Sequence, residues 1–411
     1  EHVHVAHRTM ISFVLVSSRV LNLRAYDTVH FAASQTCMRR PNSISDRNER
    51  VQFGSLRRVH SFHTHRRMHR RLHIHCSQFD NERSQIVPEE MPRARLEFLK
   101  EIQTVPSTNI NLGRAALLIS SDVEHSSIDI DKYLNIFDDL AQRADALVPS
   151  DARYPMRIVR AINEVIYGPP PDEDDLSPAL SEGNDDGENQ QLYFKTDINI
   201  LDPKNSLIDK VIDRRQGIPI TLALVYIEVA RRMGLELESL NLPGMVVTGL
   251  LRPSDPSLDF FIDPFRRGDV QFLEDCENRL SEVYGHKVKL GEASLDRTKN
   301  SNWKPRFLGR LLHNLKAIYI ETSVIDKALP AIEMTLMLYP NRAGERRDRG
   351  FCLYFLEKWV EARRDLLFYS ESVLSPPDAD LVNSTLKDIE RRLGLERQFQ
   401  LTYNDEHEAL D

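Results

Sequence analysis

Cysteine is scarce in this chain, which contains only four in 411 residues: Cys37, Cys76, Cys276 and Cys352. So few cysteines in so long a chain exclude the dense disulfide framework of a small secreted domain and fit a reducing compartment. Long apolar runs are also missing, because no segment approaches the ~20 apolar residues that a membrane-spanning helix needs. With 41% hydrophobic residues the chain can still bury large cores, so we expect a soluble protein of two or three domains.

Residues 1–75 lack lysine altogether and contain 13 arginines against four acidic residues. The stretch up to residue 85 is also rich in serine and histidine and has no sustained hydrophobic periodicity. This composition is typical of an organelle transit peptide. We predict that residues 1–85 are disordered and direct the protein to the chloroplast or, as the alternative, to the mitochondrion. The remainder is acidic overall, which argues against a nucleic-acid partner.

Six histidines and a cysteine crowd the end of this N-terminal segment, and both residue types commonly bind zinc. They are His60, His63, His65, His69, His73, His75 and Cys76. Four arginines at positions 66, 67, 70 and 71 lie among them, and their positive charge would repel a metal cation. No pattern indicates a fold that could fix a ligand geometry, which a metal site requires. We therefore predict no metal site and no cofactor.

Residues 86–300 are predicted to form one domain that begins with amphipathic helices. Apolar residues recur at spacings of three and four, as at Leu96, Leu99 and Ile102, and this spacing predicts helices up to residue 167. Residues 169–190 then contain eight acidic residues and no basic one. Such a segment buries too little apolar surface to fold, so we predict a solvated loop. The alternative is that its charge attracts a basic partner or a metal ion.

The centre of the chain predicts a buried helix followed by a small antiparallel sheet. Asp202 is expected to cap a helix that runs through residue 215, and Gly217 is expected to prevent the helix from continuing. A second helix begins at Pro219, ends near Gly234 and is apolar nearly all round, so we expect it at the centre of the domain. Three short strand-like segments follow, at residues 238–242, 246–251 and 260–262. This order indicates an α+β architecture that is mostly helical.

A helix start, a strand start and a strand that ends in Asp-Pro are the places where papain-like or transglutaminase-like cores present Cys, His and Asp. Here the corresponding residues are Thr221, Met245 and Asp263. Thr221 has no adjacent base to activate it, so we interpret it as a capping or packing residue. Met245 can neither accept nor donate a catalytic proton. Asp263 is expected to accept backbone hydrogen bonds in an Asx turn, and it is the vestigial triad position.

Several motifs together resemble the SirB-one family, whose N-terminal domain is transglutaminase-like and whose C-terminal part is tetratricopeptide-like. The matching runs lie at residues 205–207, 214–219, 241–244, 262–265, 314–316 and 346–350. Family members typically carry His after the Pro-Gly, where this chain has Met245, and the superfamily's Cys position falls near Pro219 to Thr221. The resemblance implies a degenerate enzyme fold reused for binding, and the organelle-type N-terminus points to a plant, plastid-type member.

Residues 301–400 are predicted to form a tetratricopeptide-like helical array. Residues 307–375 match themselves at an offset of 34, which pairs Tyr319 with Leu353, Ala328 with Ala362 and Ile332 with Leu366. A final helix is predicted at residues 380–393. Because two repeats are fewer than a free array usually needs, we expect the array to dock on the central domain and share its core.

The charged run at residues 346–349 has two interpretations. Arg347, Asp348 and Arg349 are predicted as cleft or interface residues that form an ion-pair network bridging the two halves of the molecule. The alternative is a cup that holds an anionic group.

The sequence favours a non-catalytic interaction protein that binds a protein or peptide partner not identifiable from the residues. The alternative is an acyl-transfer or hydrolytic enzyme with a rebuilt active site near Asp263, completed by Cys276 or His313, since triads assemble from distant residues. Neighbouring acids argue against Cys276 because they raise the pKa of a thiol. His313 lies in a leucine-rich helix and is interpreted as a core residue.

Overall fold

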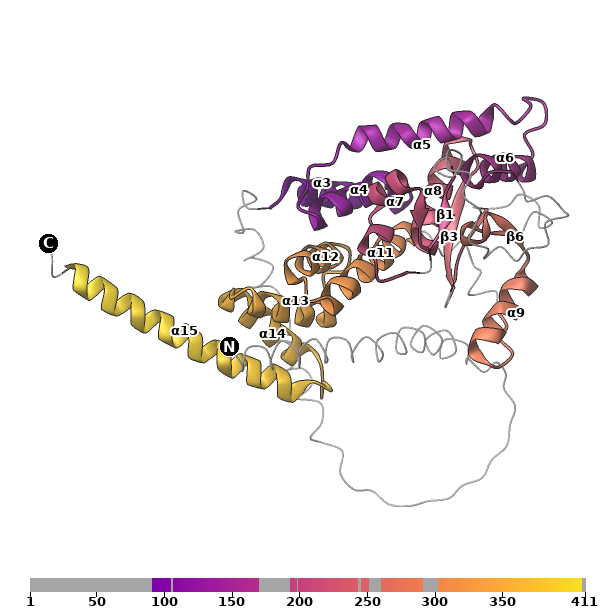
Figure 1. The fold of residues 1–411 in the computed structure, drawn as a ribbon. Coiled ribbons are helices and arrows are strands. Elements are labelled where there is room, and N and C mark those ends of the chain that lie inside the picture. The colour runs from indigo at the N-terminus through magenta and orange to yellow at the C-terminus, as the bar shows by residue number, and fades with distance from the viewer. Residues whose placement is uncertain are drawn as a thin grey trace, which may run out of the picture. The chain divides into compact units, whose positions relative to one another are not determined.

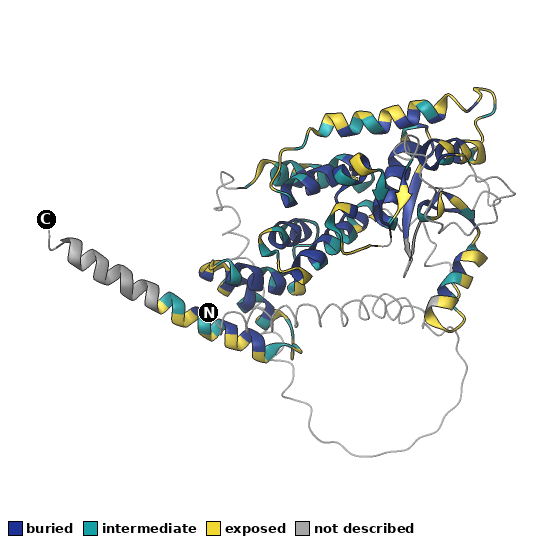
Figure 2. Ribbon diagram, in the orientation of Figure 1, coloured by how far each residue is buried: buried dark blue, intermediate teal, exposed yellow. Residues whose placement is uncertain are grey.

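Helix α8 (Pro219–Arg232) is the central helix of the first half of the molecule, and its residues 220–230 are buried without interruption. The computed structural model describes residues 91–104, 106–169, 193–197, 199–242, 245–250, 260–290 and 302–408. In it α8 contacts three α-helices and three strands. Pro219 occupies its first turn, where the missing N–H breaks no hydrogen bond. Gly234, at φ 79°, follows its end. The central position predicted from its all-apolar sequence is confirmed (Figure 2).

A four-stranded antiparallel sheet packs against α8 in the order β3-β4-β5-β6. Its strands are β3 (Leu237–Leu242), β4 (Met245–Leu250), β5 (Phe261–Asp263) and β6 (Asp269–Gln271). The register pairs Leu242 with Met245, Thr248 with Ile262 and Asp263 with Asp269. The three predicted strands are present, and β6 is a fourth strand that was not predicted.

Four amphipathic helices of the described chain precede α8, as the apolar spacing predicted, and the last three of them pack on it. They are α3 (Arg93–Ile102), α4 (Leu112–Val123), α5 (Ile130–Asp145) and α6 (Pro155–Tyr167), with a short 3-10 turn η2 (Ser107–Asn109). Asn111 and Asp129 cap α4 and α5 by accepting hydrogen bonds from N–H groups of the first turn. Figure 1 shows α5 running above α4 and α8.

The segment before α8 differs from the prediction in one respect. Asp202 does not cap a continuous helix to residue 215; its side chain caps a 3-10 turn, η3 (Pro203–Asn205), and α7 (Ile208–Arg214) begins separately. Arg215 then takes a left-handed conformation at φ 52°, which ends α7. The two-residue strands β1 (Lys195–Thr196) and β2 (Gln216–Gly217) pair in parallel just before α8.

The second half is a stack of helical hairpins. Its helices are α11 (Trp303–Glu321), α12 (Ile325–Leu338), α13 (Ala343–Phe355), α14 (Trp359–Ser372) and α15 (Ala379–Glu408). The predicted period is confirmed, since α12 and α14 begin 34 residues apart and the paired residues Ala328 and Ala362 are both fully buried. Helix α15 continues to Glu408, well beyond the predicted end at residue 393.

The two halves share one core, as predicted from the small number of repeats. Helices α11 and α12 pack on α4, and α11 also packs on β3. Buried residues of both halves join a single hydrophobic cluster, and the described residues from Ala94 onward fall into one compact unit. Polar contacts reinforce the junction: Lys304 donates to the carbonyls of Thr108 and Ile110, and Lys327 pairs with Glu124 at 2.9 Å.

Three predictions concern residues outside the described part of the chain: the disordered segment 1–85, the histidine cluster at residues 60–76 and nearly all of the acidic loop 169–190. Within the described residues no helix is long and apolar enough to cross a membrane.

Candidate functional site

The sheet register places Met245 and Asp263 toward the same end of the sheet, while Thr221 lies in the first turn of α8. Strands β3 and β4 both pack against α8. Strand β4 begins with Met245 at this end, and the antiparallel β5 finishes there with Asp263. The three positions are therefore arranged as a helix start and two strand ends, which is the arrangement of a transglutaminase-like triad.

At the start of α8, the hydroxyl of Thr221 is hydrogen-bonded to backbone groups. Its Oγ1 accepts a hydrogen bond from the Ile218 N–H at 3.1 Å and lies 2.8 Å from the Asn205 carbonyl oxygen. The side chain is fully buried. The capping interpretation is confirmed, and the hydroxyl has no histidine or carboxylate among its hydrogen-bond partners.

Asp263 is buried, with 2% of its surface exposed, and both of its carboxylate oxygens have partners. Oδ1 accepts from the Phe265 N–H at 3.0 Å, which is the predicted Asx turn and begins the 3-10 turn η5 (Pro264–Arg266). Oδ2 accepts from Arg279 Nη1 at 2.6 Å, across to helix α9 (Leu273–Tyr284). In a catalytic triad this carboxylate would accept a hydrogen bond from an imidazole. In this structure it accepts one from the guanidinium group of Arg279.

Cys276 lies on α9 close to this ion pair, so the fold does bring a thiol near Asp263. Its Sγ is 3.8 Å from Gln271 Oε1, and Arg279 donates to the same amide oxygen at 3.2 Å. The thiol is fully buried in a small core with Leu240, Phe261 and Leu280. Burial is the main cause that raises the pKa of Cys276 to about 11, and the neighbouring acids add to it while Arg279 opposes. The thiolate needed for nucleophilic attack is therefore disfavoured.

His313 lies on α11, in the helical array, and is half-buried rather than fully enclosed in the core. The structure thus brings Thr221, Met245, Asp263 and Cys276 to one domain, while His313 belongs to the other half. Among the described residues there is no cluster of three or more side chains suited to hold a metal ion.

The charged run of α13 forms an ion-pair network, but this network lies inside the array. Lys316 Nζ contacts both Glu345 and Asp348, at 2.8 and 3.0 Å. Arg347 pairs with Asp348 and Asp378, and Arg349 with Asp365. These ion pairs join residues of the helical array, so the predicted network is present there, while a role in bridging the two halves stays a prediction.

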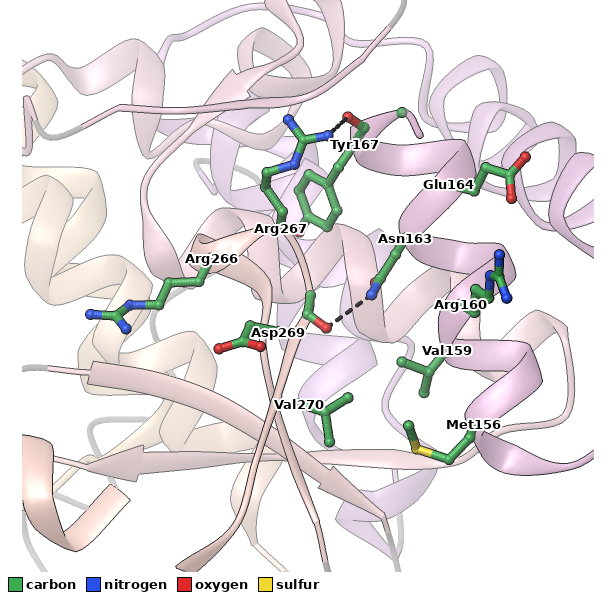
Figure 3. Close-up of a pocket in the computed structure, with 12 residues that line it drawn as sticks. Met156, Val159, Arg160, Asn163, Glu164, Tyr167, Arg266, Arg267, Asp269 and Val270 are labelled. Atoms are coloured by element: carbon green, nitrogen blue, oxygen red, sulfur yellow. Dashed lines mark hydrogen bonds between the residues drawn. The ribbon is translucent and has the colours of Figure 1, made fainter. Parts of the chain in front are cut away.

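A pocket of about 600 Å³ lies between α6 and the η5–β6 segment that follows Asp263, and we call it the α6–β6 groove (Figure 3). One wall is a single face of α6, and the other is the η5–β6 segment. The lining residues are Met156, Val159, Arg160, Asn163, Glu164, Tyr167 and Gly168 on one side and residues 266–270 on the other.

Two residues of this region escaped the sequence reasoning. Arg279 is the partner of Asp263, and its only sequence signal is its position three residues after Cys276 on an amphipathic helix. Asn163 joins α6 to the turn before β6 by donating to the Gly268 carbonyl at 2.9 Å. A polar residue in the middle of an apolar helix face was the available signal, but it does not identify a partner 105 residues away.

Comparisons with protein families agree with this division of the molecule. Residues 187–309 match a model of the transglutaminase-like superfamily, and residues 315–387 match a tetratricopeptide repeat model. No solved structure matches the chain significantly.

Individual relatives are similar over much of the chain. A UPF0162 protein of Xylella fastidiosa (strain 9a5c) is 28% identical over 295 residues, which cover 72% of this chain and 95% of the relative. Protein SirB1 of Salmonella typhimurium is 25% identical over 185 residues, covering 44% and 65%. F-box only protein 21 of Pongo abelii is 27% identical over 221 residues, covering 50% and 34%. The chain thus carries a transglutaminase-like domain followed by tetratricopeptide-type repeats and is similar to bacterial UPF0162 and SirB1 proteins.

Proposed function

We propose that this protein is a non-catalytic interaction protein, in which a transglutaminase-like domain without its catalytic residues supports a helical array that binds a protein or peptide partner. The observation that carries the proposal is the state of Asp263, whose two oxygens are taken by Arg279 and by the Phe265 N–H. A carboxylate held in this way has no imidazole to orient, and general base catalysis needs such a base within hydrogen-bond reach of a nucleophile. Membership in the group of UPF0162 and SirB1 proteins is part of the proposal and is supported by the similarity over 95% of the Xylella relative.

The array offers a surface on the first helix of its first hairpin. Stacked helical repeats bind partners on an extended concave face. Helix α11 presents a stripe of partly exposed side chains at spacings of three and four, whose members are Arg306, Arg310, His313, Asn314, Ala317 and Glu321. We name these residues the α11 stripe and assign the partner to it.

The test compares variants of the full chain in partner capture from an extract, followed by crosslinking and quantification of each captured protein. Arg306→Glu and Asn314→Ala alter the α11 stripe, while Lys387→Glu is the control because Lys387 is equally exposed on α15. We expect one captured protein to be reduced at least fivefold by the stripe variants and to be retained by Lys387→Glu and by Asp263→Asn. If every captured protein binds the stripe variants as well as it binds the wild type, the assignment of the partner to the α11 stripe is contradicted.

The competing enzyme reading, an acyl-transfer or hydrolytic catalyst rebuilt near Asp263, is tested on the same protein. Thiol- and hydroxyl-directed activity probes are applied to the native full chain, and labelled sites are mapped by mass spectrometry. Labelling of Cys276 or Thr221 that disappears in Asp263→Ala overturns the non-catalytic proposal. No labelling at either residue in the native chain agrees with it.

An organellar location, with chloroplast preferred to mitochondrion, is a separate part of the proposal and is supported only by the arginine-rich, acid-poor composition of residues 1–75. A fluorescent reporter fused behind residues 1–85 and expressed in plant cells tests it. Fluorescence in plastids agrees with the proposal, and fluorescence confined to the cytosol or to mitochondria contradicts the chloroplast assignment.

A further inference from the structure

The α6–β6 groove combines a helix face with the open edge of a sheet. Strand β6 is last in the sheet order, so within the described residues it pairs with β5 on one side and with no strand on the other. Outside the sheet, the backbone of residues 269–271 makes no further hydrogen bond with the described residues. In an antiparallel pair alternate residues leave their N–H and C=O on the open side, and these groups can pair with an added strand.

Both walls of the groove are held in place by hydrogen bonds from the domain core. Tyr226 of α8 donates to Asn163 Oδ1 at 2.8 Å, and Asn163 in turn donates to the Gly268 carbonyl at 2.9 Å. Arg267 Nη2 donates to the carbonyls of Tyr167 and Pro169, which ties the turn before β6 to the end of α6 (Figure 3). A groove fixed in this way loses little conformational entropy when it is filled.

The charges at the groove favour an acidic occupant. Arg160 and Arg266 are exposed, and neither guanidinium group has an ion-pair or hydrogen-bond partner among the described residues. Arg267 adds a third positive charge, and its Nη2 donates to two carbonyl oxygens. Glu164 and Asp269 also line the groove, so the net excess is positive by one charge. The exposed Met156 and the partly exposed Val270 give the lining an apolar part for an anchoring side chain.

We propose that the α6–β6 groove binds an extended acidic peptide segment of a partner protein, which adds as a strand to the open edge of β6 beside α6. Strand addition supplies main-chain hydrogen bonds, and side-chain pockets supply specificity. Because β6 has three residues, the main-chain pairing is short. An acidic side chain paired with Arg160 or Arg266 and an apolar residue over Met156 and Val270 therefore contribute the rest of the affinity. This site is separate from the α11 stripe, and either can fail without the other.

The test uses peptides selected from a library of short linear peptides displayed on phage and panned on the full chain. Each selected peptide is synthesised with a fluorescent label, and its site is mapped by hydrogen exchange. We expect a group of acidic peptides that protects residues 155–167 and 268–271. Arg160→Glu and Arg266→Glu should each weaken their binding about two- to fivefold, as the loss of a charge pair at an exposed site implies.

Two controls separate strand addition from general charge attraction. Arg157→Glu changes an exposed arginine on α6 that does not line the groove, and it should change the affinity less than twofold. A peptide with alternate backbone amides N-methylated keeps its side chains but loses half of its donors, and we expect its binding to fall at least tenfold. Equal binding of the methylated peptide overturns the proposal, as does a peptide set that protects only the array.

A second copy of the chain is the other possible occupant of an open strand edge. Analytical ultracentrifugation of the full chain distinguishes the two. A monomer that binds the acidic peptides agrees with the proposal. A dimer that Arg266→Glu dissociates and that excludes the peptides overturns it.

Discussion

A single arginine, Arg279, balances the buried charge of Asp263. Asp263 is almost fully buried, and removal of a partner from a buried ion pair leaves an uncompensated charge. We expect Arg279→Met to destabilise the protein by about 1–3 kcal/mol, because Arg279 itself is a quarter exposed and solvent screens part of the pair. Arg279→Lys should recover part of the loss. Chemical denaturation measures the difference.

The double variant Asp263→Asn with Arg279→Met provides the control for this prediction. Asparagine keeps an acceptor for the Phe265 N–H and carries no charge, so the double variant should be more stable than Arg279→Met alone. Equal unfolding midpoints for the wild type and Arg279→Met would show that the ion pair contributes nothing.

Cys276 illustrates how burial, rather than nearby acids, sets the reactivity of a residue. Its pKa is raised to about 11, so at neutral pH the group is an enclosed neutral thiol. We predict that iodoacetamide at pH 8 leaves Cys276 unmodified in the native protein and modifies it fully in denaturant. Site-resolved mass spectrometry measures both, and rapid native labelling would contradict the burial described here.

At the scale of elements, Gly268 sets the distance between α6 and β6. Its φ is +74°, and a Cβ atom built there would lie 1.9 Å from Asn163 Oδ1. We expect Gly268→Ala to cost about 2–3 kcal/mol, because backbone strain and loss of the Asn163 hydrogen bond act together. Thermal or chemical unfolding measures this cost.

Gly285 provides a matched control for that substitution. It also has a positive φ, +67°, but no atom lies within 4 Å of a built Cβ. Gly285→Ala should therefore cost only the strain of the left-handed conformation, about 1–2 kcal/mol. Equal losses for the two variants would show that the contact with Asn163 is unimportant for stability.

At the scale of the whole molecule, Glu124 joins the two halves and makes their association sensitive to acid. Burial raises its pKa, but hydrogen bonds from Tyr319 and Lys327 lower it more, so its folded pKa lies below 4.5. A depressed carboxylate pKa contributes stability above the unfolded value and loses it as the pH falls through the folded value. We expect Glu124→Gln to cost about 1 kcal/mol at pH 7 and progressively less below pH 4.5.

Two optical signals test whether the halves unfold together. Both tryptophans, Trp303 and Trp359, lie in the helical array, so their fluorescence reports on that half, whereas far-ultraviolet circular dichroism reports on all helices. Coincident urea transitions are expected for the wild type because the halves share one core. A fluorescence transition that precedes the circular dichroism transition contradicts a single cooperative unit.

The sequence by itself determined the elements whose signal is local. The all-apolar run of α8 between Pro219 and Gly234, the 34-residue period of the array and the Asx turn at Asp263 are set by neighbouring residues, and the structure contains each of them. The presence of methionine at position 245, after Pro243-Gly244, is likewise visible in the residues alone.

Only the tertiary structure decided which distant side chains meet. Arg279 reaches Asp263 across 16 residues, Asn163 reaches Gly268 across 105 and Lys327 reaches Glu124 across 203. Periodicity shows which face of an element is buried, but it does not show which polar group on another element faces it. The charged run of α13 is a further example. Its residue types predicted ion pairs, but the partners of these residues follow from how the helices of the array pack.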